Sequence, residues 1–497
     1  MGPDRTVLHR VSPGGRPRPH RGRFLLAGIV LATAALAAAC SSGGGTITGS
    51  GSPSAASGSA AAAPSAGTAS GTGADWPEFD QNGARTGAAA GVPAPGRLAV
   101  AWTAGLDGAV YGQPLVIGGH VIAATEDDSI YALSRTTGQV IWRTHVGTPV
   151  PREDLHGCGN IFPLGITGTP VYDPGNGLVY AVAEVTGYQH LLVGVDAATG
   201  TVRVRRALDD PTASNQPGYN QQRPALAIDD GRVYATFGGL SGDCGPYQGS
   251  VVSAPLSGDG PLARWQVPTG REGAIWATGG PVVGPDGNLW VSVGNGAAEA
   301  GDGYDGSDSV TELTPALQRV AFFAPSTWAD DNAHDLDLGS TQPVLAAGGT
   351  VFIMGKRGTG YLLSASRPGG IGGQLAQQAI CQAFGTAAVT GSTVYEPCKG
   401  GPLAAVDVDA ATRSVKVLWR GPSGSNGTPV VGGGAVWVTQ YSDSGGPGTL
   451  YALSQATGQV EQQIAIGQGL PHFSSLSLSG GTAYVSTLTG VTAVNGA

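Results

Sequence analysis

Short apolar runs alternate with tight turns along the chain from residue 98 onward. In residues 113–142, QPLVIGGHVIAATEDDSIYALSRTTGQVIW, four apolar runs are separated by Gly-Gly, by Glu-Asp-Asp and by Thr-Thr-Gly. Runs of about four to six residues joined by such turns are typical of antiparallel β-strands. This stretch therefore predicts a four-stranded antiparallel sheet.

The same unit recurs through the chain. The phrase YALSxxTGQV occurs at residues 131–140 and again at 451–460. Eight first strands are expected, opening on a proline in most units: Pro114, Pro170, Pro224, Pro281, Pro343, Ala387, Pro429 and Leu476. Four-stranded units repeated at intervals of about 40 to 60 residues are typical of β-propellers. The expected fold is all-β, an eight-bladed propeller over residues 76–497.

The two ends of the repeat region fit together. The last unit stops after three strands, at GVTAVNGA, whereas a spare run, LAVAWTAGL at residues 98–106, precedes the first unit. We expect this N-terminal strand to complete the eighth blade, because closure removes two open sheet edges.

The N-terminus reads as an export signal. Six arginines precede an apolar run at residues 24–38, which is too short to span a bilayer comfortably, so residues 1–40 predict a signal peptide. The small residues before Cys40 resemble a bacterial lipobox. This resemblance implies that Cys40 is lipidated and anchors the protein at the outer face of the cytoplasmic membrane. The alternative is an ordinary signal peptide with an incidental cysteine.

Composition distinguishes a linker from the folded part, and net charge argues against a nucleic-acid partner. Residues 41–75 are almost entirely Gly, Ser, Ala, Thr and Pro, which predicts a disordered linker. The chain has 26 basic and 35 acidic residues, and removal of the six Arg and one Asp of residues 1–40 leaves a net charge near −14. A nucleic-acid partner is not expected, because it requires a cationic surface.

Four cysteines remain if Cys40 is lipidated. An even number in an exported protein predicts two disulfides. Cys158 and Cys244 have similar surroundings, HGCGN and GDCGPY, whereas Cys381 and Cys398 lie across a predicted hairpin. We therefore expect the pairs 158–244 and 381–398, one of three connectivities.

Three stretches, residues 75–87, 132–142 and 195–200, resemble pyrroloquinoline-quinone (PQQ)-like repeats. Such repeats build eight-bladed quinoprotein dehydrogenases and cofactor-free relatives of the BamB type. The whole arrangement is similar to exported actinobacterial lipoproteins with PQQ-like repeats. In such blades the glycine allows a tight turn, and the tryptophan, here Trp142 and Trp419, packs between sheets.

The loops before the first strands are expected to converge at one mouth of the propeller channel. Polar and aromatic side chains gathered at such a mouth make it the default binding site. The candidate ligand-binding residues are His156, Arg223, Glu272, Trp276, His334, Asp335, Asp337 and His472.

The densest acidic stretch is residues 330–337, DDNAHDLD. Its oxygens can hold Ca²⁺ through Asp331, Asp335 and Asp337, and His334 can add a nitrogen for a transition metal. The alternative is that these acids cap turns.

The other candidates also have two interpretations. Arg223 either meets a ligand carboxylate or forms a salt bridge with an acid of the next blade. Glu272 and Trp276 are either a base and a stacking platform or, for the tryptophan, a core plug. His156 either lines the mouth or is only held by the adjacent disulfide, and His472 either lines the channel or is an ordinary loop residue.

Two functions follow from the resemblance. The preferred one is a non-catalytic binding or scaffold module for a protein, peptide or glycan, with no cofactor. The alternative is a PQQ- and Ca²⁺-dependent quinoprotein dehydrogenase that oxidises an alcohol or sugar. Alcohol dehydrogenases of that family carry two adjacent cysteines, and this chain has neither that pair nor a CxxCH haem motif. A third reading, a sugar- or peptidoglycan-processing enzyme, rests on the acidic stretch alone.

Overall fold

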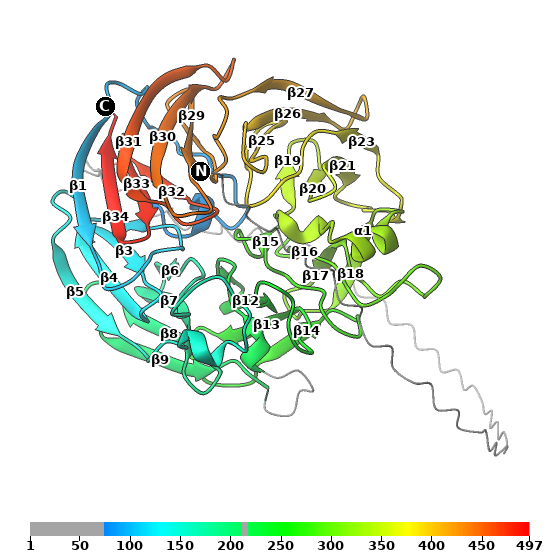
Figure 1. Ribbon diagram of the computed structural model, residues 1–497, viewed down its shortest axis with the longest axis horizontal. Helices are drawn as coiled ribbons and strands as arrows, with labels where there is room; N and C mark the ends of the chain where they lie inside the picture. Colours follow the sequence, from blue (N-terminus) through cyan, green and yellow to red (C-terminus); the bar gives the residue numbers. More distant parts are fainter. Residues whose placement is uncertain (1–73, 211–216, 497) are drawn as a thin grey trace, which may run out of the picture. The chain divides into compact units, whose positions relative to one another are not determined.

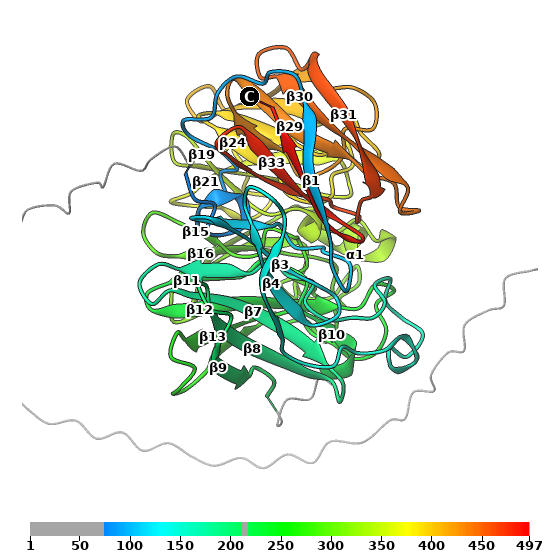
Figure 2. The ribbon, with the colours of Figure 1, turned by 90° about the vertical axis from the view of Figure 1, so that its left-hand side faces the viewer.

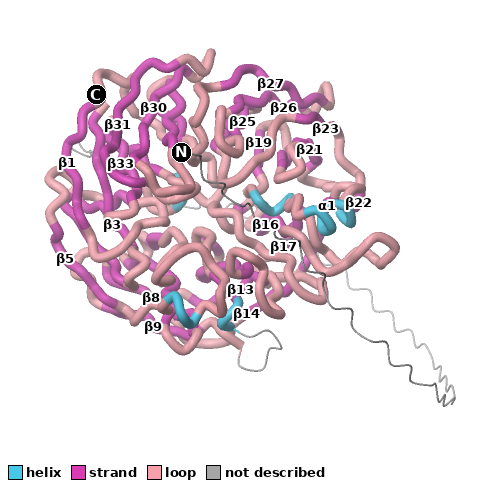
Figure 3. Tube along the Cα trace, viewed as in Figure 1, coloured by secondary structure: helices cyan, strands magenta, loops and turns pink. Residues whose placement is uncertain are grey.

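The protein is described by a computed structural model that covers residues 74–210 and 217–496. The predicted signal peptide, Cys40 and the predicted linker up to residue 73 lie outside the described residues. Nearly all regular structure is strand (Figure 3). The one α-helix of the described residues is α1 (Trp328–His334), and the other helical pieces are short 3-10 helices. Within these ranges, no helix combines the length and hydrophobicity needed to cross a membrane.

Eight antiparallel sheets surround a central axis, which confirms the predicted eight-bladed propeller (Figure 1). In blades 1 to 7 the four main strands follow the chain from the axis outward. Blade 1 contains β2 (Leu115–Ile117), β3 (His120–Ala124), β4 (Ser129–Ser134) and β5 (Val140–His145). Blade 2 contains β6 (Val171–Asp173), β7 (Leu178–Val185), β8 (Gln189–Asp196) and β9 (Val202–Ala207). Blade 3 contains β11 (Ala227–Asp229), β12 (Arg232–Gly239), β13 (Ser250–Pro255) and β14 (Ala263–Gln266), with β10 (Asn220–Gln221) added beside β12.

The remaining blades have the same plan. Blade 4 contains β15 (Val282–Val283), β16 (Leu289–Val293), β17 (Ser309–Leu313) and β18 (Arg319–Ala324), and β22 (Gly370–Ile371) joins its outer edge. Blade 5 contains β19 (Val344–Ala346), β20 (Thr350–Met354), β21 (Thr359–Ser364) and β23 (Ala376–Ala379). Blade 6 contains β24 (Ala388–Thr390), β25 (Thr393–Glu396), β26 (Ala404–Asp409) and β27 (Ser414–Arg420). Blade 7 contains β28 (Val430–Gly432), β29 (Ala435–Gln440), β30 (Pro447–Ser454) and β31 (Val460–Gly469).

Blade 8 closes the ring as predicted. It contains β32 (Leu476–Ser479), β33 (Thr482–Thr487), β34 (Gly490–Asn495) and, as its outer strand, β1 (Ala99–Gly105). The pairing of β1 with β34 runs antiparallel from Ala99 opposite Asn495 to Gly105 opposite Gly490. Figure 2 shows β1 lying along this last sheet. The two ends of the folded chain are therefore joined within one sheet.

The core consists of layers between neighbouring blades. Each of seven large apolar clusters draws its buried residues from adjacent blades. The cluster that includes Trp102, Trp437 and Tyr484 joins blades 7, 8 and 1 across the closure. Because every blade contributes to two such layers, no blade can bury its apolar faces alone.

Tryptophans on outer strands dock onto the next blade and explain the repeated phrase. Trp142 lies against Gly200 of blade 2 and donates a 3.1 Å hydrogen bond to the carbonyl of Ala197. Trp419 packs in the same way against Gly458 of the second phrase. The sequence analysis missed a third member, Trp102 of β1, which donates to the Arg135 carbonyl at 3.1 Å and faces the glycine of the first phrase.

Residues 75–92, here called the plug segment, close the end of the channel opposite the predicted mouth. Backbone amides of the inner strands donate to its carbonyls at 2.7 to 2.8 Å, and they come from Tyr172, Val283, Val389 and Val431. Trp76 pairs with Val116 of blade 1 through two further backbone bonds. The segment therefore ties together the inner strands of five blades and satisfies amides that would otherwise lack partners.

Arg85 is the buried anchor of the plug segment. Its guanidinium donates to Glu78 at 2.8 Å, to the carbonyl of Phe79 at 3.0 Å and to the carbonyl of Leu226 at 2.7 Å. The side chain is fully buried, so these bonds are shielded from water. Blade 3 is thus held to the plug segment by a side chain.

The docking of Trp102 gives a first prediction. Gly138 has φ = 70°, and a Cβ there would lie 2.5 Å from the Trp102 ring. We expect Gly138→Ala to lower the free energy of unfolding by about 2 kcal/mol or more, because overpacking adds to the left-handed backbone cost. The control is Gly177→Ala, which has φ = 74° but open space around the new Cβ. Urea unfolding that gives equal losses for the two variants would contradict this docking.

The plug segment gives a second prediction. Arg85→Met leaves Glu78 and two carbonyls without their donor, and we expect it to destabilise the fold by about 3 kcal/mol. The control, Arg97→Met, changes an exposed arginine and should stay within about 0.5 kcal/mol of the parent. Thermal unfolding of both variants measures the difference, and an undisturbed Arg85→Met protein would show that the plug segment is dispensable.

Candidate functional site

A cavity of about 940 Å³ opens on the axis at the face opposite the plug segment. Six of the eight predicted binding residues line it: Arg223, Glu272, Trp276, Asp335, Asp337 and His472. The loops before the first strands therefore converge in space. A cavity of this size lies within the range of small-molecule sites, about 300 to 1,000 Å³.

His156 and His334 do not line the cavity, contrary to their predicted place at the mouth. His156 lies outside it because its ring packs against Tyr188 and Tyr219, with centroids 5.4 and 4.6 Å away. His334 is the exposed last residue of α1 and is paired with Asp330, Nδ1 to Oδ1 at 3.0 Å. Both histidines are used in local contacts on the outside of the loops.

Three aromatic rings meet on the axis and form the floor of the cavity. Trp276, Phe384 and Phe473, here called the aromatic triad, come from the loops before blades 4, 6 and 8. Their ring centroids are 6.1 to 6.3 Å apart, and the two phenylalanine rings are nearly parallel. All three rings are partly exposed, so Trp276 lines the cavity instead of being buried in the core.

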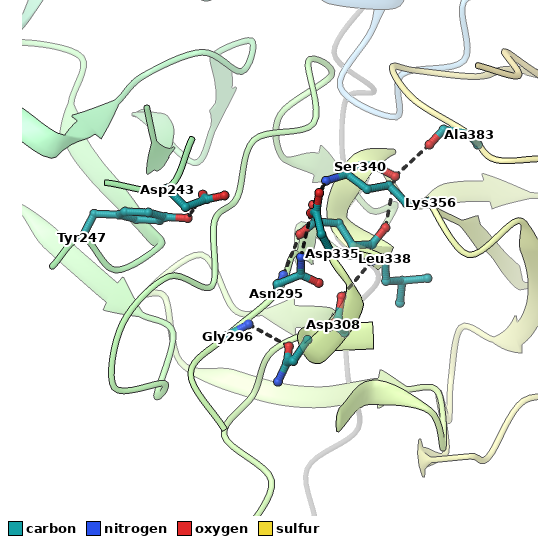
Figure 4. Close-up of polar contacts among 12 residues, drawn as sticks. Asp243, Tyr247, Asn295, Gly296, Asp308, Asp335, Leu338, Ser340, Lys356 and Ala383 are labelled. Atoms are coloured by element: carbon teal, nitrogen blue, oxygen red, sulfur yellow. Dashed lines mark hydrogen bonds and ion pairs between the residues drawn. The ribbon is translucent and has the colours of Figure 1, made fainter. Parts of the chain in front are cut away.

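Lys356 stands beside this floor between two carboxylates. Its Nζ lies 2.5 Å from both Asp335 Oδ1 and Asp337 Oδ2, and Figure 4 shows Lys356 beside Asp335. The same Nζ lies 5.6 Å from the centroid of the Trp276 ring. Burial alone lowers the pKa of Lys356, but the two carboxylates outweigh it and raise the pKa overall. Asp337 also accepts the backbone amide of Asn295 at 2.7 Å. The result is a rigid, charged wall.

The acidic stretch 330–337 is therefore paired with basic side chains. Asp330 and Asp331 both accept hydrogen bonds from Arg357, and Asp335 and Asp337 share Lys356. Residues 330–334 of the stretch lie in α1, where the sequence analysis expected a loop, and Asp335 and Asp337 follow the helix. Over the described residues, no group of three or more His, Cys, Asp or Glu is placed to hold a metal ion.

Arg223 has no acidic partner among the described residues, so the predicted salt bridge to the next blade is not formed. The centre of its guanidinium lies 4.7 Å from the centroid of the Phe473 ring. Burial lowers the pKa of Arg223 to about 10, so the group stays cationic at neutral pH. His472, beside it, is kept neutral because burial and Arg223 lower its pKa to about 3.

Both predicted disulfides are present, and both brace loops of the cavity wall. Cys158–Cys244 joins the loop after blade 1 to the hairpin of blade 3 that contributes Ser241 and Asp243. Cys381–Cys398 joins two loops that contribute Phe384 and Lys399. The cavity therefore has covalent supports in addition to its packing.

Two residues that line the cavity have a left-handed backbone. Glu272 and Phe473 have φ values of 65° and 59°, a region in which residues other than glycine are uncommon. Such conformations cost about 1 to 3 kcal/mol each and persist where the surroundings enforce them. The floor and its rim are thus held in place at an energetic cost.

Sequence reasoning missed several residues of the cavity. Lys356, Asn295, Lys399 and the Asp243–Tyr247 pair lie on turns between second and third strands, which reach the same face as the loops before the first strands. The predicted mouth includes only the loops before the first strands, although strand alternation brings these turns to the same face. Phe384 and Phe473 lay in the predicted mouth loops, but apolar residues were not considered there.

Comparison with known proteins agrees with the repeat pattern. Residues 94–291 match the family described as outer membrane protein assembly factor BamB. No curated protein matches the chain at the threshold applied. The predicted resemblance to PQQ-like repeat propellers is confirmed.

Solved structures share the fold at low sequence identity. A quinohemoprotein alcohol dehydrogenase from Pseudomonas putida superposes with a TM-score of 0.66 and 15% identity, covering 85% of this chain and 80% of the other. A europium-containing methanol dehydrogenase gives 0.61 and 15%, covering 84% and 97%. BamB from Moraxella catarrhalis gives 0.55 and 13%, covering 80% and 99%. These likenesses concern the fold alone.

Carboxyl groups are buried at the mouth end of the second strands of three blades: Glu126, Glu184 and Glu396. Burial raises the pKa of Glu396 to about 8, against an ordinary value of 4.5. The folded chain therefore keeps a proton that the unfolded chain releases between these pH values. Stability must fall as the pH rises through this window.

Glu396→Gln tests this dependence, because an amide stays neutral at every pH. We expect the parent protein to lose thermal stability between pH 5 and pH 9, and the variant to lose less, by about 2 °C or more. The control Glu461→Gln alters an exposed residue and should follow the parent. Parallel curves for the parent and Glu396→Gln would show that Glu396 is ionised in the fold.

Proposed function

We propose that the protein is a non-catalytic binding module of the cell envelope that holds a saccharide in its axial cavity. The observation that carries this proposal is the cavity itself, with an aromatic floor and polar walls. An aromatic ring offers a flat apolar surface for the face of a sugar ring, and carboxylates and amides bond its hydroxyl groups. A concave site of this size suits a glycan end better than a flat protein surface.

The chain's N-terminus supports an envelope location. The apolar run at residues 24–38 and the small residues before Cys40 fit export and lipidation. Two disulfides fit an oxidising compartment outside the cytoplasm. The proposed place is the outer face of the cytoplasmic membrane, with a lipid anchor at Cys40.

A PQQ-dependent dehydrogenase is the second candidate, favoured by Lys356 and Asp337 beside the Trp276 ring. PQQ would supply the oxidising group, and the cavity has room, an aromatic platform and a basic side chain for such a planar acid. The residues do not fit the accompanying cation, because Asp335 and Asp337 are already paired with Lys356. The chain also lacks adjacent cysteines.

Binding and oxidation assays separate the two candidates. We expect glucose and N-acetylglucosamine oligomers to change the tryptophan fluorescence of the purified protein, and Trp276→Leu to abolish that change. The control Trp328→Leu alters a tryptophan at the start of α1, outside the cavity, and should retain it. Added PQQ and Ca²⁺ should give no dye-linked oxidation of alcohols or sugars. Dye reduction without saccharide binding would contradict the proposed binding function and support the dehydrogenase instead.

A further inference from the structure

The inner side of the cavity holds a positive charge that the described protein does not neutralise. Among the described residues Arg223 makes no ion pair and no hydrogen bond; its Nη2 group is shielded from solvent, whereas the half-buried side chain keeps its other donors open to the cavity. Leaving a cation desolvated and unpaired is costly. The side chain lines the cavity, so a bound group can reach it.

The backbone around Arg223 is fixed on both sides. Gln221 pairs with Gly238 of β12, and the amide of Gln222 donates to Glu184 at 2.7 Å. The Gln222 side chain donates to the carbonyl of Pro224 at 2.6 Å. The guanidinium is therefore presented from a rigid support, as binding sites require.

The groups nearest Arg223 carry no compensating charge at neutral pH. His472 is neutral there, and burial raises the pKa of Glu126 to about 8. Glu126 is in addition held by the amide of Gly165 at 2.8 Å and the hydroxyl of Thr167 at 3.1 Å. Next to Arg223, neither of these groups competes with an incoming anion for the guanidinium.

We infer that Arg223 binds the carboxylate of an acidic saccharide whose ring packs on the aromatic triad. This inference rests on the proposed function and names its ligand class. A guanidinium donates a charge-assisted hydrogen bond to a carboxylate, and the Phe473 ring beside it lies at the edge of the floor.

The charge of the walls limits the ligand to one negative group. Five carboxyl groups and three basic side chains line the cavity, so a polyanion would meet more repulsion than attraction. The same carboxyl groups suit a hydroxylated ring. These acceptors favour a sugar acid over an aromatic acid.

Glucuronic acid, glucose, benzoate and PQQ are the probes, titrated into the full purified protein by calorimetry. We expect glucuronic acid to bind about 10-fold more tightly than glucose, the gain typical of a charge-assisted hydrogen bond. Arg223→Gln should remove this preference. Arg203→Gln, which removes an exposed charge on the outer strand β9, should preserve it. Thermal midpoints establish that the variants fold, and the preference of the parent protein tests the inference without any variant.

The outcomes distinguish this inference from the proposed function. Equal binding of glucose and glucuronic acid by the parent overturns the role of Arg223 but leaves saccharide binding intact. Absence of binding of either sugar overturns both. Tighter binding of benzoate or PQQ than of glucuronic acid overturns the inference that the ligand is a sugar acid. A preference for glucuronic acid that is retained in Arg223→Gln overturns the assignment of the carboxylate to Arg223.

Discussion

Each blade has two apolar faces that must be covered, and every other feature of the protein depends on this constraint. A small sheet cannot cover its own faces, so each face packs against the neighbouring sheet. Every face is covered only when the ring closes. The pairing of β1 with β34 provides that closure. The buried layer around Trp102 and Trp437 shows that the closing blade is packed as fully as the others.

The closed ring fixes the directions of the loops and so makes the cavity. First strands run from the mouth to the plug segment, and second strands run back to the mouth. The loops before the first strands and the turns after the second strands therefore alternate around one opening. Residues far apart in sequence, such as Arg223 and Phe473, therefore meet on the axis. The binding surface is a consequence of the repeat, although the side chains on it are not repeated.

The fold could be predicted from the sequence because turn residues and apolar runs are local signals. Blade number, ring closure and disulfide pairing all follow from such signals. The cavity could be predicted only in part. Arg357 and Lys356 neutralise acids more than 18 residues earlier in the chain, and no local pattern reveals that pairing. Trp102 was missed because its blade is assembled from both ends of the chain, so its repeat context is split.

The two disulfides hold the loops at the mouth, whereas the blades are held together by packing. Neither sulfur bridge lies between the main strands of a blade; one joins Cys158 to Cys244 and the other Cys381 to Cys398, all four in loops at the mouth. Dispersion and the exclusion of water hold the blades together, whereas the loops around the opening are linked covalently. Reduction of the disulfides would thus loosen the loops around the cavity and leave the packing between the blades unchanged. The redox state of the compartment therefore affects the shape of the cavity and not the architecture of the propeller.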